Sequence, residues 1–283
     1  MELLQPADWP EALEARAAHP GAVPLWGGTD VMVDLNFGRE RPETILDLTR
    51  VRELAEWGER EDEIRIGAGV SYTTAIADLG DQLPGLAAAS RTVGSPQIRN
   101  RGTIGGNLGS SSPAGDALPP LYASDAEVEL ASTTGTRRMP IAEFITGPKR
   151  NVLAPDELIT AVYVRPAPGA QQFSKVGTRN AMVIAVCSFA LELDPHGRRV
   201  GTCIGSAAPM PVRAREAEAF AADALDWDGK GELNPDTAAR FGELVASAAS
   251  PIDDVRGSAA YRRHALSVLA RRTLSWAWSE QCA

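Results

Sequence analysis

Apolar and polar residues alternate in several short stretches of the first half of the chain, a period of two that is typical of half-buried strands. Residues 63–69 read EIRIGAG and residues 126–131 read AEVELA. Short apolar runs bounded by turn residues predict further, more deeply buried strands. The strands predicted in this half lie at residues 22–26, 44–48, 63–69, 126–131 and 157–164.

Helical spacing of apolar residues is clearest near the C-terminus, where three long helices are predicted at residues 212–224, 236–249 and 259–278. Three strands are expected before them, at residues 172–176, 184–193 and 200–205. The helices predicted in the first half are shorter, and Asp8 and Ser71 are N-cap candidates for two of them. These helices lie at residues 8–19, 31–35, 72–77, 86–92 and 117–121.

The order of these elements predicts an α+β fold, because strands and helices mix without regular βαβ alternation. The segment RPAPG at residues 165–169 is rich in Pro and Gly and is the main candidate linker. We find no fixed-period repeat and no low-complexity tract in the chain.

A Gly-rich segment at residues 94–116, GSPQIRNRGTIGGNLGSSSPAGD, interrupts the periodic patterns. It contains two small-residue stretches that we expect to form turns, residues 103–107 and 110–113. Glycine allows close approach of a backbone or a ligand, and successive N–H groups can bind an anion. The spacing fits neither a phosphate-binding P-loop nor the dinucleotide fingerprint. Alone, this segment is equally well explained as a tight structural turn.

Composition narrows the functional classes. The formal net charge of −9 argues against a nucleic-acid surface. The 3 cysteines and 3 histidines are scattered, so we expect no disulfide framework and no metal site. No run approaches the roughly 20 apolar residues of a membrane span. The N-terminus lacks a signal pattern, so we expect a cytoplasmic protein.

Several motifs together make the Gly-rich segment more specific. A second glycine turn, WGGTD at residues 26–30, follows the first predicted strand. The element KVGTR at residues 175–179 follows the linker, and IGSAAP lies at residues 204–209. With IGAG at 66–69 and TIGGN at 103–107, the chain resembles the FAD-binding medium subunit of the molybdenum hydroxylases, the xanthine dehydrogenase and carbon monoxide dehydrogenase family.

This resemblance implies a fold that periodicity alone did not provide. It is a two-subdomain FAD-binding fold of the vanillyl-alcohol-oxidase/PCMH type, followed by a smaller α+β C-terminal flavoprotein domain. The units expected are FAD-binding subdomain 1 at residues 1–55, FAD-binding subdomain 2 at 56–168, and the C-terminal domain at 169–283.

The resemblance also implies roles for individual residues around FAD. Two turns would hold the pyrophosphate, Asp116 would bond the ribose or ribityl hydroxyls, and two apolar residues would lie near the adenine. The FAD-binding residues so implied are Leu25, Trp26, Gly27, Gly28, Thr29, Asp30, Thr103, Ile104, Gly105, Gly106, Asn107, Ser110, Asp116, Leu158, Ile159 and Lys175.

Lys175 and Ile184 are the residues expected beside the flavin ring. A lysine near the pyrimidine end would stabilise the negative charge of a reduced flavin. We therefore hypothesise that Lys175→Met leaves folding intact and lowers the flavin potential. The chain departs from the family at Gly109, where relatives often have Cys, and at Val183 and Ile184, where some relatives have Asp and an aromatic residue. An aliphatic Ile184 slightly favours a soluble acceptor such as NAD.

The resemblance implies an electron-transfer subunit. A large partner subunit would hold molybdenum–pterin, and a small partner with two [2Fe–2S] clusters would pass electrons to FAD. The flavin would then reduce NAD, oxygen, a quinone or another carrier, and the expected assembly is a dimer of heterotrimers. Two alternatives stay open: a free-standing FAD-dependent oxidoreductase acting directly on a small substrate, and a scaffold subunit without flavin.

Overall fold

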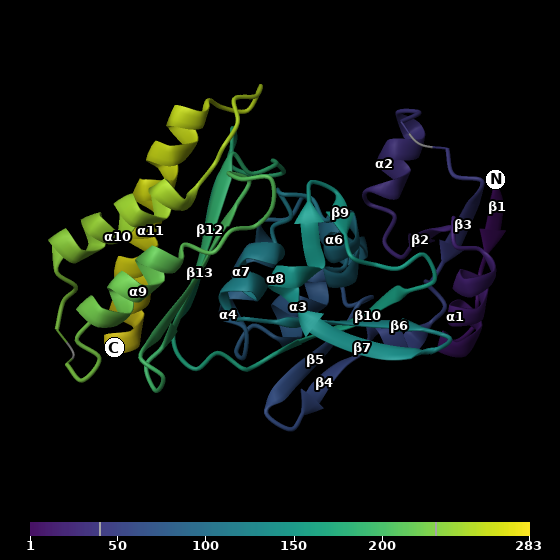
Figure 1. The fold of residues 1–283 in the computed structure, drawn as a ribbon, viewed down its shortest axis with the longest axis horizontal. Coiled ribbons are helices and arrows are strands. Elements are labelled where there is room, and N and C mark those ends of the chain that lie inside the picture. Colours follow the sequence, from purple (N-terminus) through teal and green to yellow (C-terminus); the bar gives the residue numbers. More distant parts are fainter. Residues whose placement is uncertain (40, 230) are drawn as a thin grey trace.

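The computed structural model describes residues 1–39, 41–229 and 231–283. Three main sheets follow one another along the long axis of the molecule (Figure 1). The N-terminal strands occupy one end, a five-stranded sheet lies in the middle, and the C-terminal sheet with its long helices forms the other end. The architecture is α+β, as predicted.

The N-terminal sheet has three parallel strands in the order β1-β3-β2. Helix α1 begins beyond Asp8, whose carboxylate accepts the Glu11 N–H at 2.9 Å, so this N-cap prediction is confirmed. The bounds of these elements are β1 Glu2–Leu4, α1 Trp9–Ala18, β2 Val23–Leu25, α2 Val31–Asn36 and β3 Thr44–Asp47.

The central sheet is antiparallel, with strand order β4-β5-β10-β6-β7. Strand β10 lies in its middle, and six of its seven residues are buried. Such a continuous apolar run is what a strand covered on both faces requires. The strands are β4 Trp57–Arg60, β5 Glu63–Gly67, β6 Glu127–Ser132, β7 Gly135–Pro140 and β10 Leu158–Val164, and the one-turn helix η1 Arg52–Ala55 precedes them.

Short helices connect and cover the central sheet, and one of them corrects the sequence analysis. Residues 103–107 do not form a turn: Thr103 caps helix α6, which contains the glycines. The second predicted turn begins where this helix ends, at Ser111 in the left-handed conformation (φ +46°). The helices are α3 Tyr72–Asp78, α4 Pro84–Arg91, α5 Pro96–Arg101, α6 Ile104–Ser110, α7 Leu118–Ala123 and α8 Ile141–Phe144.

The C-terminal sheet, β11-β12-β13, is antiparallel and is covered on one face by α9, α10 and α11 (Figure 1). Two predicted boundaries shift. Strand β12 begins at Cys187 rather than at residue 184. Helix α9 begins at Arg215 rather than at residue 212, because Val212 pairs with Ile204 as an isolated bridge. The elements are β11 Gln171–Val176, β12 Cys187–Asp194, β13 Arg199–Gly205, α9 Arg215–Ala224, α10 Pro235–Ala248 and α11 Ala259–Cys282.

Several small elements were not predicted from the sequence: β1, β4, β7, α5, α8 and the pair β8 Ile145–Gly147 and β9 Arg150–Asn151. None of the helices in the described part of the chain is both long enough and apolar enough to cross a membrane.

Candidate functional site

The two glycine-containing segments lie directly against each other, although they are far apart in the sequence. A methyl group on Gly27 would lie 1.9 Å from the backbone oxygen of Arg101, so only glycine fits there. The Arg101 guanidinium donates to the Trp26 carbonyl at 3.3 Å. Gly28 adopts a left-handed conformation (φ +74°), which turns the chain from β2 into α2.

Ser110 and Asp30 join the far ends of the same two segments. The Ser110 hydroxyl lies 2.8 Å from Asp30 Oδ2. Asp30 precedes α2 and Ser110 ends α6, so this contact fixes the start of one helix beside the end of the other. Asp30 of the first predicted group thus contacts the end of α6, while Gly27 lies against Arg101, the last residue of α5.

Backbone donors at the start of α6 are engaged within the protein. The N–H groups of Ile104 and Gly105 donate to the carbonyls of Val70 and Ala68, and the N–H of Gly106 donates to the Thr103 hydroxyl. A methyl group on Gly105 would lie 2.4 Å from the Ala68 Cβ. Glycine at 105 is therefore needed for close packing inside the protein, and the first N–H groups of this helix already have partners.

Asp116 and Lys175 form a buried ion pair between the central and C-terminal parts of the molecule. Lys175 Nζ lies 2.5 Å from Asp116 Oδ2, and the two side chains are 8% and 9% exposed. The Lys175 ammonium also donates to the Thr92 carbonyl at 3.3 Å, and the Thr92 hydroxyl lies 3.4 Å from Asp116 Oδ2. The structure thus brings together two residues that sequence reasoning had assigned separately.

The second carboxylate oxygen, Asp116 Oδ1, is buried and has no hydrogen-bond partner within the described residues. An orphaned buried oxygen is costly and calls for a partner from outside the chain or from solvent. Burial raises the pKa of the Asp116 carboxyl, and the Lys175 ammonium opposes that rise. Burial also raises the pKa of Tyr72, with a further contribution from the negative charges of Asp116 and Asp30.

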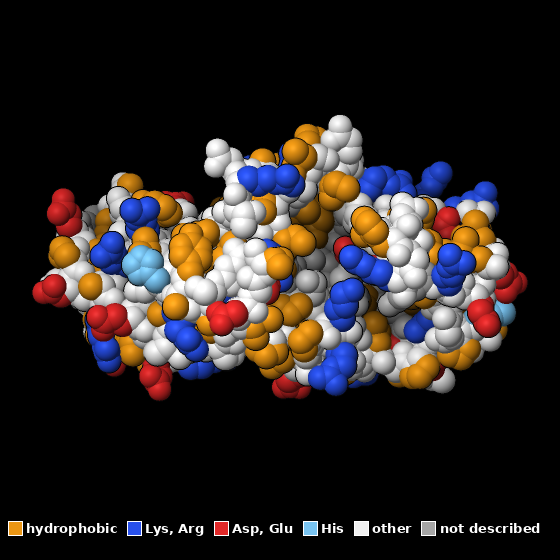
Figure 2. All heavy atoms as spheres, turned by 90° about the horizontal axis from the view of Figure 1, so that it is seen from above, with side chains coloured by type: hydrophobic (Ala, Val, Ile, Leu, Met, Phe, Trp, Pro, Cys, Tyr) orange, Lys and Arg blue, Asp and Glu red, His pale blue; other side chains and the backbone are white. Residues whose placement is uncertain are grey.

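A groove of about 480 Å³ opens beside Lys175, between the end of α4 and the loop that follows β11. Its polar lining is basic: besides Lys175 it includes Arg91, Arg99 and Arg179. The face of the molecule seen in Figure 2 is hollowed near its middle, and basic side chains border the hollow. A local basic groove in a chain of net charge −9 favours an anionic ligand.

The remaining predicted residues are more dispersed. Leu158 is buried in the N-terminal core, whereas Ile159 packs against the core of the central sheet. Asn107 accepts the Ala117 N–H at 3.2 Å and so connects α6 to the residue after Asp116. Ile184 lies in the loop between β11 and β12 with 58% of its surface exposed.

Thr92, Tyr72 and Arg91 were not predicted from the sequence to belong to this site, whereas Arg179 lies in the KVGTR motif at residues 175–179. Thr92 contributes mainly a backbone carbonyl, which no residue pattern reveals. Arg99 donates to the carbonyls of Val93 and Gly94 and so holds the loop between α4 and α5. The Ser71 hydroxyl that caps α3 places Tyr72 at the start of that helix, and this cap was the one sequence signal near Tyr72.

Two family models match the chain and together span most of it. The model described as the FAD binding domain in molybdopterin dehydrogenase matches residues 1–167. The model described as the CO dehydrogenase flavoprotein C-terminal domain matches residues 172–277.

Individual proteins are similar over comparable lengths. The chain is 33% identical over 275 residues to the xanthine dehydrogenase FAD-binding subunit of Escherichia coli O157:H7, covering 94% of this chain and 91% of that one. It is 37% identical over 207 residues to the nicotinate dehydrogenase FAD-subunit of Eubacterium barkeri, covering 68% and 69%. A solved structure of carbon monoxide dehydrogenase from Hydrogenophaga pseudoflava superposes with a TM-score of 0.90 at 25% identity, covering 99% of this chain and 98% of that one.

Proposed function

Because the chain belongs to the family of FAD-binding subunits of molybdenum hydroxylases, we propose that it is the electron-transfer subunit of such an enzyme. It carries FAD, which supplies reversible two-electron and one-electron redox chemistry when bound. The FAD takes electrons from [2Fe–2S] clusters of a partner and passes them to NAD, oxygen, a quinone or another acceptor.

The residues present fit this cofactor. The single observation that carries the proposal is the buried Asp116 carboxylate, whose Oδ2 is paired with Lys175 while its Oδ1 lacks a partner in the described chain. A carboxylate oxygen accepts strongly from hydroxyl groups such as those of ribose or ribityl. The basic groove beside the pair suits a ligand that carries phosphates.

The two glycine segments have different tasks in this proposal. The backbone of residues 27–29 and the Thr29 hydroxyl are the candidate donors to the pyrophosphate, together with the side chain of Asn107. Ser110, whose hydroxyl is bonded to Asp30, continues the wall of the same cradle. The first N–H groups of α6 are already bonded within the protein, so residues 103–106 mainly shape the wall of the site. Leu25 and Trp26 hold the turn in place, since the Trp26 ring packs against Gly69.

Lys175 is proposed to lie beside the flavin ring and to stabilise its reduced, anionic form. Ile184 covers the ring face, and Leu158 and Ile159 contribute apolar surface near the adenine. The chain would then consist of three units, residues 1–55, 56–168 and 169–283. The first two hold the cofactor, and Lys175 of the third sets the reduction potential of the flavin.

Membership of the family supports a proposal for the partners. The proposed assembly is a dimer of heterotrimers in the cytoplasm, with a molybdopterin-binding large subunit and a small subunit that holds two [2Fe–2S] clusters. This chain has no group of three or more His, Cys, Asp or Glu residues in metal-binding arrangement among its described residues. In this proposal, substrate hydroxylation takes place in the molybdopterin-binding large partner.

Spectroscopy of the purified full chain tests the proposal. We expect flavin absorbance after addition of FAD, and a lower flavin midpoint potential in Lys175→Met than in the unmodified chain. A chain that stays colourless with excess FAD would support the scaffold alternative. Oxidation of an organic donor by the isolated chain would support a free-standing oxidoreductase instead.

A further inference from the structure

Strand β11 presents two sets of side chains to opposite sides, because successive residues of a strand alternate. Gln172 and Ser174 face the C-terminal helices, where Ser174 bonds Thr273 at 2.9 Å and Gln172 bonds Glu280 at 2.6 Å. Gln171 and Lys175 project from the other face, toward the helices of the central part. The two residues are four positions apart in the sequence, which is roughly 13 Å along the strand.

Lys175 holds one end of each of two helices. Its ammonium bonds the carbonyl of Thr92, the residue that caps the C-terminal end of α4. The same ammonium pairs with Asp116, two residues before α7 begins. The ion pair is therefore positioned by the end of α4 and the start of α7.

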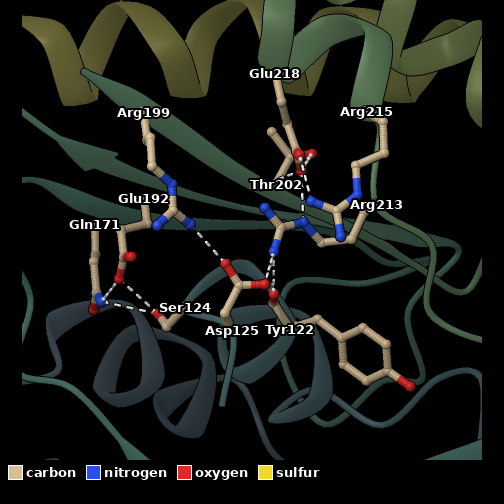
Figure 3. Close-up of polar contacts among 10 residues, drawn as sticks. All are labelled: Tyr122, Ser124, Asp125, Gln171, Glu192, Arg199, Thr202, Arg213, Arg215 and Glu218. Atoms are coloured by element: carbon tan, nitrogen blue, oxygen red, sulfur yellow. Dashed lines mark hydrogen bonds and ion pairs between the residues drawn. The ribbon is translucent and has the colours of Figure 1, made fainter. Parts of the chain in front are cut away.

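Gln171 holds the opposite ends of the same two helices, and Figure 3 shows its contact at the Ser124 end of α7. Its Oε1 accepts the Gly85 N–H at 3.0 Å, in the first turn of α4. Its Nε2 donates to the Ser124 hydroxyl at 3.1 Å, at the residue that ends α7, and also to the Glu192 carboxylate of the neighbouring strand β12. The Ser124 hydroxyl donates to the same Glu192 oxygen at 2.7 Å.

Helix α7 lies directly on the sheet between these two ends. A methyl group on Gly201 of β13 would lie 2.0 Å from the Ala123 backbone oxygen, and one on Gly205 would lie 2.9 Å from the Pro119 ring. Arg213 reinforces the Ser124 end by donating to the Tyr122 carbonyl at 3.0 Å and by pairing with Asp125 (Figure 3). With both ends fixed, a shift at one end of α7 is transmitted to the other.

We propose that Gln171 is a positioning residue for the flavin site: by holding the far ends of α4 and α7 against β11, it fixes Asp116 and Thr92 around Lys175. The inference rests on the proposed function, since it treats the Asp116–Lys175 pair as part of the FAD site. Glu192 orients the amide of Gln171, so that its Nε2 faces Ser124 and its Oε1 faces Gly85.

Exchanging the side chains of Gln171 and Glu192 tests the positioning role of Gln171. Gln171→Glu places two carboxylates against each other and removes the donor to Ser124, and we expect the FAD dissociation constant of the full chain to rise about tenfold. The double variant Gln171→Glu with Glu192→Gln restores one amide and one carboxylate, and we expect it to return to within about threefold of the unmodified chain. Gln171→Met removes the hydrogen bonds of the amide without adding a charge. It replaces Gln171→Glu in the measurement of FAD affinity if Gln171→Glu does not fold.

Ser174→Ala is the matched control, because it removes one hydrogen bond from the opposite face of the same strand. It should lower the melting temperature and leave both FAD affinity and flavin midpoint potential unchanged. Gln171→Met should shift that potential in the same direction as Lys175→Met. In the FAD-free chain it should also speed hydrogen exchange around Thr92 and Asp116, the helix ends remote from the substitution.

The outcomes separate the two proposals. If the unmodified chain does not bind FAD, or Lys175→Met leaves the potential unchanged, the proposed flavin site is wrong, and hydrogen exchange still tests the positioning. A different outcome would overturn the positioning role of Gln171. In that outcome FAD binds and Lys175→Met lowers the flavin midpoint potential, but the Gln171 variants have the same midpoint potential and the same hydrogen exchange around Thr92 and Asp116 as Ser174→Ala.

Discussion

Replacing Lys175 by Met should make the stability of the chain depend on pH in a specific way. The substitution leaves the Asp116 carboxyl buried without its counter-ion, since both side chains are at least nine-tenths buried. The hypothesis from sequence, that this variant folds normally, treated Lys175 as free of such a partner. The ion pair changes that expectation: the variant should fold with a measurable loss of stability.

The size of this loss is bounded by protonation of Asp116. Removing one partner of a buried ion pair costs about 3–5 kcal/mol in other proteins. The carboxyl can instead take up a proton. An aspartate that ordinarily ionises near 3.8 costs at most about 4 kcal/mol to keep neutral at pH 7, because each pKa unit is worth about 1.4 kcal/mol. We expect a loss of about 3 kcal/mol at pH 7.

The sign of the pH dependence follows from the same argument. Burial raises the folded-state pKa of Asp116, and removal of the ammonium raises it further. The destabilisation should therefore be greatest above that folded pKa and should shrink as the pH falls toward 3.8, where the unfolded chain also binds the proton.

Urea unfolding of the FAD-free chain, followed by tryptophan fluorescence at several pH values between 5 and 8, measures this effect. The double variant Asp116→Asn with Lys175→Met should recover more than half of the loss, because no charge is then buried. Lys149→Met is the control: its lysine is 70% exposed and lies 3.9 Å from Asp34, so about 0.5 kcal/mol or less is expected. A loss that is constant across this pH range, or a double variant no more stable than Lys175→Met, would refute the reasoning.

Two further predictions concern other parts of the fold. Gly27→Ala places a methyl group 1.9 Å from the Arg101 carbonyl, and we expect FAD affinity measured by fluorescence quenching to fall at least tenfold, whereas Gly21→Ala, where nothing lies within 4 Å, should match the unmodified chain. Asp254→Asn removes a carboxylate that accepts from Arg262 at 2.6 Å and whose pKa is lowered by its arginine partners. Its melting temperature should be about 3 °C lower at pH 7, and the difference should narrow as the pH falls below 3.8, the ordinary value for Asp; an equal difference at pH 7 and pH 3 would contradict this account.

Elements with strong periodic patterns could be predicted from the sequence. Strand β10 was expected at 157–164 and spans Leu158–Val164, because a nearly continuous apolar run between turn residues leaves few alternatives. Helix α11 was expected at 259–278 and extends to Cys282. The Ser71 and Asp8 caps were also predicted, since a side-chain acceptor at that position satisfies a helix N–H that is otherwise free.

Elements that depend on tertiary contacts could not be predicted. Helix α6, IGGNLGS, is poor in helix-forming residues, and it is held by the Thr103 cap and by the hydrogen bond from Ile104 to Val70. Strand β7 is almost entirely exposed, so it shows no apolar alternation, and its pairing with β6 defines it.

In the candidate site too, some features could be predicted from the sequence and others depend on tertiary contacts. Family resemblance named both Asp116 and Lys175, but their pairing joins residues 59 positions apart and required the fold. The same holds for the contact between Ser110 and Asp30, which are 80 positions apart. The sequence also offered no reason to include Gln171, whose amide contacts become meaningful only when α4, α7 and β12 are placed around it.

The position of Gln171 and Lys175 on one strand has a consequence for recombination between relatives. Both lie downstream of the Pro/Gly-rich linker, so a chimera joined within residues 165–169 exchanges them together, with Glu192, against an unchanged α4 and α7. A junction at residues 172–174 would combine the glutamine of one parent with the lysine of another. The last 115 residues would thus be exchanged together with Lys175 and with the side chains of Gln171 and Glu192.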